Sequence, residues 1–277
     1  RSGTNILRDV LTSYPGFITW PCDEINYIWK HHNLAVAHDQ LSSRHASPKV
    51  KKYIINKFLQ RYLSAPLNVY SDSIPKLVEK TCANSLRLPF INSIFPNCKY
   101  IFITRDPLDA IPSALKRWKA SLEPFYLYKK AKYVPITDLP YYSIKYLNNR
   151  IYKLFISKNA SLSCWGPKYK NFSKDIKSLS QIEVVTRQWF YCNSLSTKFF
   201  SDRPSIPCLK LDYNNFVNSP EESLHDILNF LLIKPNQEYI SKATSSVVNT
   251  FISKGRLSSD MTLLKINNEL ESLGYEK

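Results

Sequence analysis

Glycine, methionine and long apolar runs are scarce in this sequence. Its 277 residues include 5 glycines and 1 methionine, and no apolar run approaches the length of a transmembrane helix. Such a helix needs about 20 apolar residues, so we expect none of these residues to span a membrane. With 17 prolines among 277 residues, the chain is not of low complexity and is long enough to bury a full core.

Acidic residues are also few. The sequence has 22 Asp and Glu against 38 Lys and Arg, which gives a formal net charge of +16. An excess of this size favours anionic partners, namely nucleotides, nucleic acid, acidic polysaccharide or acidic protein segments. Charge alone does not choose among these partners, and a solvated basic surface without a partner is the alternative.

Closely spaced cysteine pairs are missing. The six cysteines are scattered, with no CxxC motif, which argues against a structural zinc site. We expect most of them to be small buried side chains: Cys22, Cys82, Cys98, Cys164, Cys192 and Cys208.

The middle of the chain alternates between strand and helix patterns. PKLVEK (75–80) and CKYIFIT (98–104) read as strands, NSLRLPFINSIF (84–95) reads as a helix, and RDPLDAIPSALKRW (105–118) as a turn followed by a helix. This order predicts an α/β fold with a parallel sheet and helices packed on it. Ligands in such folds bind beyond the carboxyl ends of the strands.

The remaining patterns extend this fold. They predict helices over 5–13, 48–63, 180–200 and 219–231, and a further strand over 207–213. Residues 15–47 look irregular and aromatic, typical of a segment that lines a cleft, and residues 120–180 look like an insertion over the sheet. No linker or repeat divides the sequence, so we expect one domain over 1–277.

The first residues, RSGTN, precede an apolar helical pattern. Glycine permits a tight turn, and the hydroxyl groups can cap the exposed N–H groups of the helix that follows. A helix start of this kind binds anions, although an ordinary N-cap would use the same residues. A phosphate-binding loop normally follows a buried strand, so we expect the natural protein to continue upstream of Arg1.

Three cations fall where predicted elements meet. Arg1 opens the glycine turn, and Lys80 and Arg105 follow the predicted strands. A single basic residue after a strand is usually a solvated surface charge. Three of them, together with a glycine turn, predict a site for a multiply charged anion.

Two of these stretches resemble a known family. RSGT (1–4) and EKTCANSLRLPFINSIFPNCKYIFITRDPLDAIPSALKRW (79–118) are similar to the sulfotransferases that use 3′-phosphoadenosine 5′-phosphosulfate (PAPS). The likeness is greatest to the branch with Golgi protein-tyrosine sulfotransferases and related bacterial enzymes, and it covers about half of the chain. It implies a P-loop NTPase-like three-layer fold, with a central parallel sheet flanked by helices.

The resemblance also implies which residues bind the donor and its desulfated product, PAP. The opening loop would hold the 5′-phosphosulfate, the segment after the second strand would hold the 3′-phosphate, and a tyrosine with a late basic segment would close over the nucleotide. The residues of the opening loop are Arg1, Ser2, Gly3, Thr4 and Asn5. Those of the 3′-phosphate segment are Arg105, Ser113 and Arg117, and those that would close over the nucleotide are Tyr213, Lys254 and Arg256. For Tyr213, a core tyrosine at a strand end is the equal alternative.

The catalytic residues follow from the same resemblance. Lys80 corresponds to the lysine that donates to the oxygen bridging sulfate and phosphate, and Arg1 would share that charge. Glu24 lies near the position of the glutamate base in the tyrosine-sulfating branch. Its competitors as the base are Asp23, His31, His32 and His38. The cytosolic branch has a histidine two residues after the lysine, where this chain has Cys82. No metal is implied.

The acceptor and the compartment stay open. An acidic carbohydrate and a protein tyrosine are the leading acceptor candidates, and a small alcohol also fits a carboxylate base. A bacterial chain would act in the cytoplasm, and a eukaryotic one with an upstream anchor in the Golgi lumen. Two other functions compete: a P-loop kinase, although the G-x-x-x-x-G-K-[ST] loop is absent, and a basic module that binds nucleic acid or another polyanion.

Overall fold

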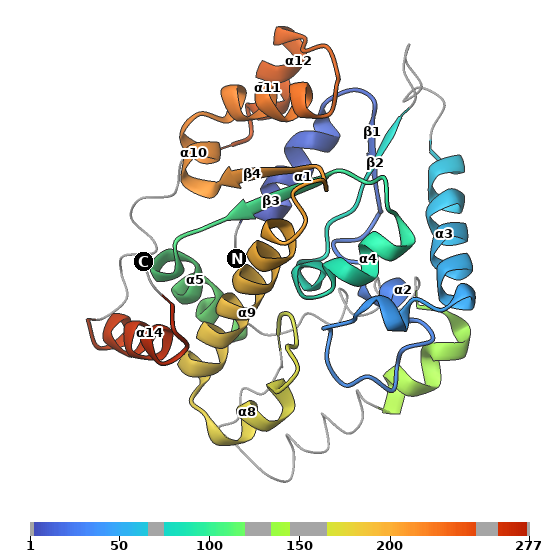
Figure 1. Ribbon diagram of the computed structural model, residues 1–277. Coiled ribbons are helices and arrows are strands. Elements are labelled where there is room, and N and C mark those ends of the chain that lie inside the picture. The colour runs from blue at the N-terminus through green and yellow to red at the C-terminus, as the bar shows by residue number, and fades with distance from the viewer. Residues whose placement is uncertain (1–2, 66–74, 120–133, 145–164, 248–259, 276–277) are drawn as a thin grey trace.

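The fold contains parallel strands and many helices. The computed structural model describes residues 3–65, 75–119, 134–144, 165–247 and 260–275 (Figure 1). Strand β1 (Phe17–Thr19) pairs in parallel with β2 (Lys76–Val78), and β3 (Tyr100–Thr104) pairs in parallel with β4 (Cys208–Asp212). The predicted α/β class with parallel strands is confirmed. Among the described residues these strands hydrogen-bond as two pairs.

Helices make up most of the described structure. The α-helices include α1 (Thr4–Ser13), α2 (Asn26–Lys30), α3 (Pro48–Leu63), α4 (Leu88–Ile94), α5 (Pro107–Lys119), α8 (Phe172–Ser178), α9 (Gln181–Ser201), α10 (Tyr213–Asn218), α11 (Pro220–Phe230), α12 (Gln237–Thr244) and α14 (Asp260–Ser272). Short 3₁₀ helices are η1 (Ser43–His45), η3 (Cys82–Leu86) and η4 (Ile136–Asp138). None of the helices in the described ranges is long and apolar enough to cross a membrane.

The β3–β4 pair lies between two layers of helices. Ile103 of β3 belongs to an apolar cluster with side chains of α1, α10, α11 and α12. Phe102, on the opposite face, packs with Phe199 and Phe200 at the end of α9. In Figure 1, α11 and α12 lie beyond one side of this pair, and the long helix α9 runs away from the other. The pair is therefore the middle of three layers.

Local sequence signals explain where several helices begin. Ser47 accepts a hydrogen bond from the Val50 N–H and precedes Pro48, the first residue of α3. Ser180 and Glu183 form a reciprocal capping box at the start of α9. Such residues satisfy the free N–H groups of a first helical turn. These are the positions at which the sequence predicted the two helices to begin.

Two sequence expectations need correction. The stretch predicted as one helix over 84–95 is the 3₁₀ helix η3 followed by α4, with Arg87 between them and Pro89 in the first turn of α4. Proline is tolerated in a first turn and disfavoured inside a helix, which is consistent with a new helix that starts there. The stretch read as irregular over 15–47 contains β1 and α2. Both are short, with 3 and 5 residues, which leaves little periodicity to detect.

Candidate functional site

The ends of the parallel strands carry two of the predicted cations. Lys80 lies two residues beyond the end of β2, and Arg105 directly follows β3. In both strand pairs the register aligns the last residues, Thr19 with Val78 and Thr104 with Asp212. Lys80 and Arg105 therefore lie at the carboxyl ends of the strands, where α/β folds bind ligands.

Lys80 forms an ion pair with Glu24. The Lys80 Nζ lies 3.1 Å from Glu24 Oε1, with 11% of the lysine side chain and 30% of the glutamate side chain exposed. The backbone N–H of Cys82 donates to the same carboxylate oxygen, at 3.2 Å. Two residues that the sequence assigned to one reaction are therefore in direct contact, although 56 positions separate them.

This contact keeps both groups charged. Burial disfavours the carboxylate form of Glu24, but the Lys80 charge and the hydrogen bonds from Cys82 and Lys80 outweigh it and hold the pKa of Glu24 below its ordinary value. Burial likewise disfavours the Lys80 ammonium, but the nearby Cys82 and Glu24 raise the pKa of Lys80 above its ordinary value. At neutral pH the pair is a carboxylate beside an ammonium.

The glycine turn at the start of α1 lies next to this pair. Gly3 is the N-cap residue of α1 and has a φ of 75°, a left-handed conformation that glycine adopts without strain. Gly3 has no side chain that could cap the helix, and Ser2, one of the two hydroxyl residues predicted to cap it, lies outside the described residues. Thr4 Oγ1 instead lies 3.8 Å from Cys82 Sγ, whose residue also contacts Glu24. The start of α1 is therefore beside the Lys80–Glu24 pair.

Tyr213 and Arg105 flank the same glycine. Tyr213 follows β4 and begins α10, and a Cβ atom added to Gly3 would lie 2.0 Å from its Cε2 atom. The guanidinium carbon of Arg105 lies 4.7 Å from the centre of the Tyr213 ring. Tyr213 is 7% exposed and belongs to the apolar cluster around α1, so it is a core tyrosine that also contacts the site. Gly3 thus connects the Lys80 side of the site with the Arg105 side.

The other predicted donor-binding residues have different surroundings. Ser113 and Arg117 both lie on α5, the helix that follows Arg105; Ser113 is partly buried and Arg117 is exposed. Asn5 is exposed in the first turn of α1. The predictions for Arg1, Ser2, Lys254 and Arg256 fall outside the described residues.

The competitors of Glu24 have partners of their own. Asp23 lies 3.4 Å from the Arg8 guanidinium and is 46% exposed. His31 Nδ1 lies 2.8 Å from Asp138 Oδ2, and both side chains are buried. His32 is exposed, and His38 lines a separate cavity. Among these residues, Glu24 is the one shown in contact with Lys80.

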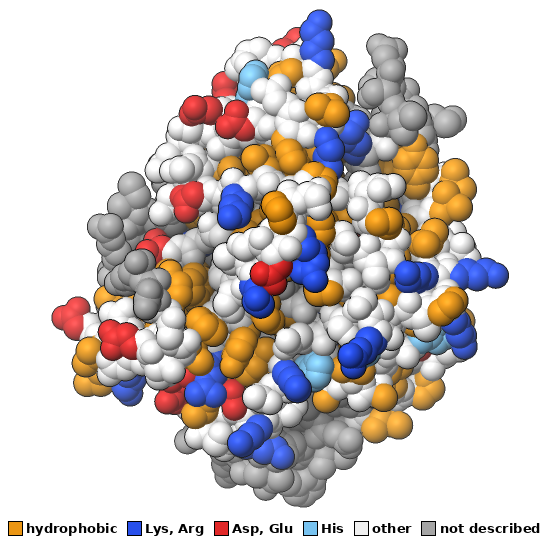
Figure 2. Space-filling model, in the orientation of Figure 1, with side chains coloured by type: hydrophobic (Ala, Val, Ile, Leu, Met, Phe, Trp, Pro, Cys, Tyr) orange, Lys and Arg blue, Asp and Glu red, His pale blue; other side chains and the backbone are white. Residues whose placement is uncertain are grey.

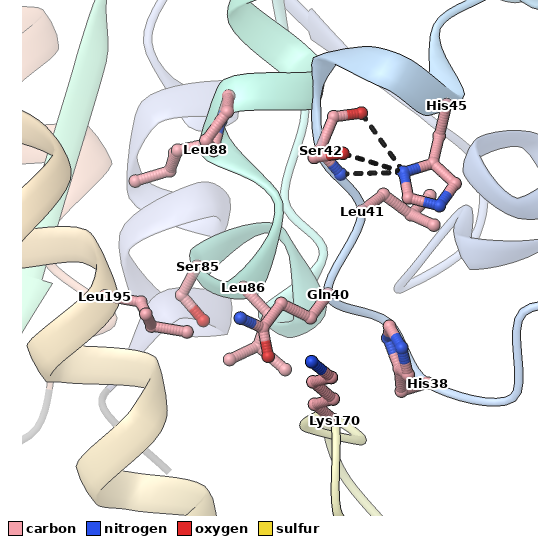
Figure 3. Close-up of a pocket in the computed structure, with 11 residues that line it drawn as sticks. His38, Gln40, Leu41, Ser42, His45, Ser85, Leu86, Leu88, Lys170 and Leu195 are labelled. Atoms are coloured by element: carbon pink, nitrogen blue, oxygen red, sulfur yellow. Dashed lines mark hydrogen bonds between the residues drawn. The ribbon is translucent and has the colours of Figure 1, made fainter.

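That cavity lies at the far end of η3. It has a volume of about 390 Å³ and lies between residues 38–45, η3, the start of α4, and α9 (Figure 3). The figure shows His38 and Lys170 on one side, and Leu86 and Leu195 on the other. No acidic residue is among the described residues that line it, and neither Lys80 nor Glu24 belongs to its lining.

Basic side chains are distributed widely over the surface. Figure 2 shows Lys and Arg side chains spread over the visible face, among hydrophobic and uncharged ones, without a single dense patch on that face. The net charge of +16 is therefore not concentrated there. A broad polyanion-binding surface is not evident on this face.

Sequence reasoning gave two neighbours of the pair no positive role. In the sequence, Cys82 is distinctive only as the residue that stands where one branch has a histidine, yet its backbone N–H donates to Glu24. Thr81 was not singled out, although its hydroxyl accepts a hydrogen bond from the Ile25 N–H. Backbone donors leave no signature in a sequence, but the run EKTC does place Thr81 and Cys82 directly after Lys80.

Comparisons with known proteins give one family. The family model described as "Sulfotransferase family" matches residues 1–151, a range that includes Gly3, Glu24, Lys80 and Arg105. Among solved structures, the sulfotransferase domain from the curacin biosynthetic pathway aligns over 99% of this chain and 94% of its own, with 14% identity and a TM-score of 0.47. No curated protein sequence matches the chain.

Proposed function

Because this chain belongs to the sulfotransferase family, we propose that it moves a sulfuryl group from PAPS to a hydroxyl group of an acceptor. The observation that carries this proposal is the contact between Lys80 and Glu24 beside the start of α1. Sulfuryl transfer needs in-line attack, a donor to the leaving oxygen and an acceptor for the hydroxyl proton, as phosphoryl transfer does. One ammonium and one carboxylate at the same place supply the last two.

The residues around Gly3 fit an anionic donor. The first turn of α1 contains no acidic residue, and among the described residues no side chain caps its N-terminus, so backbone N–H groups at the helix start can face an anion. Lys80 and Arg105 add two positive charges at the strand ends. We assign Gly3, Thr4 and Asn5 to the 5′-phosphosulfate.

The segment after β3 would bind the other end of the nucleotide. We assign Arg105, Ser113 and Arg117 to the 3′-phosphate, since Arg105 follows β3 and the other two lie four residues apart on α5. Arginine binds phosphate through charge-assisted hydrogen bonds with a fixed geometry. The Arg105 guanidinium lies against the Tyr213 ring, and this contact orients it before the nucleotide binds.

PAPS supplies an activated sulfuryl group whose sulfur–oxygen bond to the 5′-phosphate breaks as a new sulfur–oxygen bond forms to the acceptor. Glu24 accepts the proton of the attacking hydroxyl, and Lys80 donates a hydrogen bond to the departing phosphate oxygen. The products are a sulfate ester and PAP, and the proton stays on Glu24 until it is lost to water. Because the pKa of Glu24 lies below its ordinary value, the group is a carboxylate at neutral pH, the form that can accept a proton.

We place a sugar hydroxyl first among the acceptors and a protein tyrosine second. Both fit a carboxylate base, and the net charge of +16 favours an acceptor with acidic groups. The test is transfer of labelled sulfate from PAPS to an acidic oligosaccharide and, separately, to a peptide with a tyrosine among acidic residues. Label in either acceptor supports the proposal. PAPS-dependent transfer to neither, by a folded protein that also fails to bind PAP, would refute it.

A further inference from the structure

The catalytic pair is built from two loops that the β1–β2 pair does not by itself hold together. Strand pairing aligns Thr19 with Val78. Glu24 lies five residues beyond Thr19, on the way to α2, whereas Lys80 lies two residues beyond Val78. A three-residue strand leaves the Glu24 loop free to take several paths, so further contacts must fix it beside Lys80.

Thr81 makes such a contact. Its Oγ1 accepts a hydrogen bond from the backbone N–H of Ile25, at 3.1 Å, and its side chain is buried, with 4% exposed. Ile25 is the neighbour of Glu24, and Thr81 is the neighbour of Lys80. This single bond therefore joins the two loops one residue away from the ion pair, and the Cys82 N–H joins them again at Glu24 Oε1.

Glu79 sets the direction of the Thr81 hydroxyl. Thr81 Oγ1 lies 2.6 Å from Glu79 Oε1, and Asn84 Nδ2 donates to the other carboxylate oxygen of Glu79. A threonine hydroxyl has one hydrogen and two lone pairs. With its hydrogen donated to Glu79, the hydroxyl presents lone pairs to the Ile25 N–H, so Glu79 and Asn84 hold Thr81 in the orientation that accepts from the Glu24 loop.

The geometry points to Thr81 as a positioning residue that holds Glu24 against Lys80 by hydrogen-bonding the Ile25 amide. This inference rests on the proposed function, since it gives Glu24 and Lys80 their catalytic roles. Thr81 does not touch the reacting atoms in this account. Its effect is on the placement of the base, and misplacement of a catalytic group by about 1 Å costs about 100-fold in rate.

The first test replaces the threonine with a side chain of the same shape that cannot hydrogen-bond. We expect Thr81→Val to lower kcat for sulfuryl transfer about 10- to 100-fold while the Kd for PAP changes less than about threefold. Thr81→Ser, which keeps the hydroxyl, should stay within about threefold of the wild type. A structural role alone would lower stability without this split between kcat and PAP binding.

Thr244→Val is the matched control. Thr244 is 5% exposed, and its hydroxyl donates to the Ile240 carbonyl oxygen within α12. This variant also removes a buried threonine hydroxyl, although one that donates within its own helix, so a loss of stability with unchanged kcat would show that destabilisation alone does not reduce turnover. A Thr81→Val enzyme with wild-type kcat would overturn the inference.

Amide hydrogen exchange tests the contact without activity. We expect the Ile25 amide to be protected in the wild type and in Thr81→Ser, and to exchange faster in Thr81→Val, with the Leu7 amide in α1 unchanged. A rapidly exchanging Ile25 amide in the wild type would overturn the inference even if Thr81→Val does not fold. An enzyme with a protected Ile25 amide but no PAPS-dependent transfer would contradict the proposed function and leave the contact itself established.

Discussion

Lys80 Nζ and Glu24 Oε1 lie 3.1 Å apart, and each group stabilises the charge of the other. An ammonium that donates to a leaving oxygen and a carboxylate that accepts a proton would here be assembled before either substrate binds. The arrangement lowers the rearrangement needed at the moment of reaction, because the charged groups are already in place. The roles of the two residues can be separated by substitution.

Removing the Lys80 ammonium should affect turnover more than nucleotide binding. We expect Lys80→Ala to lower kcat at least about 100-fold, the cost of losing a preorganised donor to developing charge, and to change the Kd for PAP less than about fivefold. Lys76→Ala is the control, because Lys76 begins the same strand, at the end away from the pair. Steady-state kinetics and calorimetric titration measure both effects. An unchanged kcat would remove Lys80 from the mechanism.

Neutralising Glu24 should have a similar effect for a different reason. Glu24→Gln keeps the shape of the side chain but cannot accept the hydroxyl proton, so kcat should fall about 100- to 1,000-fold with PAP binding retained. Asp23→Asn is the matched control, since Asp23 is the neighbouring carboxylate and contacts Arg8. If Asp23→Asn loses turnover while Glu24→Gln does not, the base is Asp23 and not Glu24.

The pH dependence of kcat/KM distinguishes Glu24 from a histidine base. In the proposed mechanism Glu24 acts as the carboxylate, and its pKa lies below the ordinary value of 4.5, because the Lys80 charge and hydrogen bonds outweigh burial. Activity that depends on Glu24 is thus lost only as the pH falls through that low pKa. We expect kcat/KM to stay level from about pH 7.5 to about pH 5.5. A decline within that range would indicate a histidine base instead, such as His32 or His38, whose pKa burial lowers from the ordinary value of 6.5.

Gly3 should tolerate no side chain. A Cβ atom there would overlap Tyr213 and would also place a non-glycine residue at a φ of 75°. We expect Gly3→Ala to lower the free energy of unfolding by about 2 kcal/mol or more, the sum of backbone strain and overpacking. Gly274→Ala separates the two causes, since Gly274 has a φ of 72° with open space around it, and should cost only about 1 kcal/mol. Chemical denaturation of both variants makes the comparison, and equal losses would contradict the overlap with Tyr213.

The sequence predicted the fold best where signals were long or local. α3 and α9 combine extended apolar periodicity with capping residues at Ser47 and Ser180, and both begin where expected. β3 was visible as a continuous apolar run. The sequence did not predict β1, because a strand of 3 residues depends on its tertiary pairing. It also did not predict the division of 84–95 at Arg87, where Pro89 lies in the first turn of a new helix.

The site was predictable in its residue types but not in its contacts. The strand ends and the resemblance to a family indicated Lys80, Arg105 and Glu24. The position of Tyr213 against both Gly3 and Arg105 brings together three segments that are far apart in the sequence, which no local pattern records. The Cys82 N–H and the Thr81 hydroxyl act through hydrogen bonds across 58 and 56 positions, and a single sequence carries no sign of such pairing.

The central claim is that the strand ends around Gly3 bind the nucleotide of a sulfuryl donor, and titration of the protein with PAP tests it most directly. We expect PAP to bind the wild type, and Arg105→Ala to weaken binding about 10- to 100-fold, the loss of a charge-assisted contact worth about 1.5 to 3 kcal/mol. Arg203→Ala should bind as the wild type does, because Arg203 stacks on Phe199 in the same manner but belongs to a different part of the fold. A folded protein that does not bind PAP, or that prefers ADP with magnesium, would contradict the account.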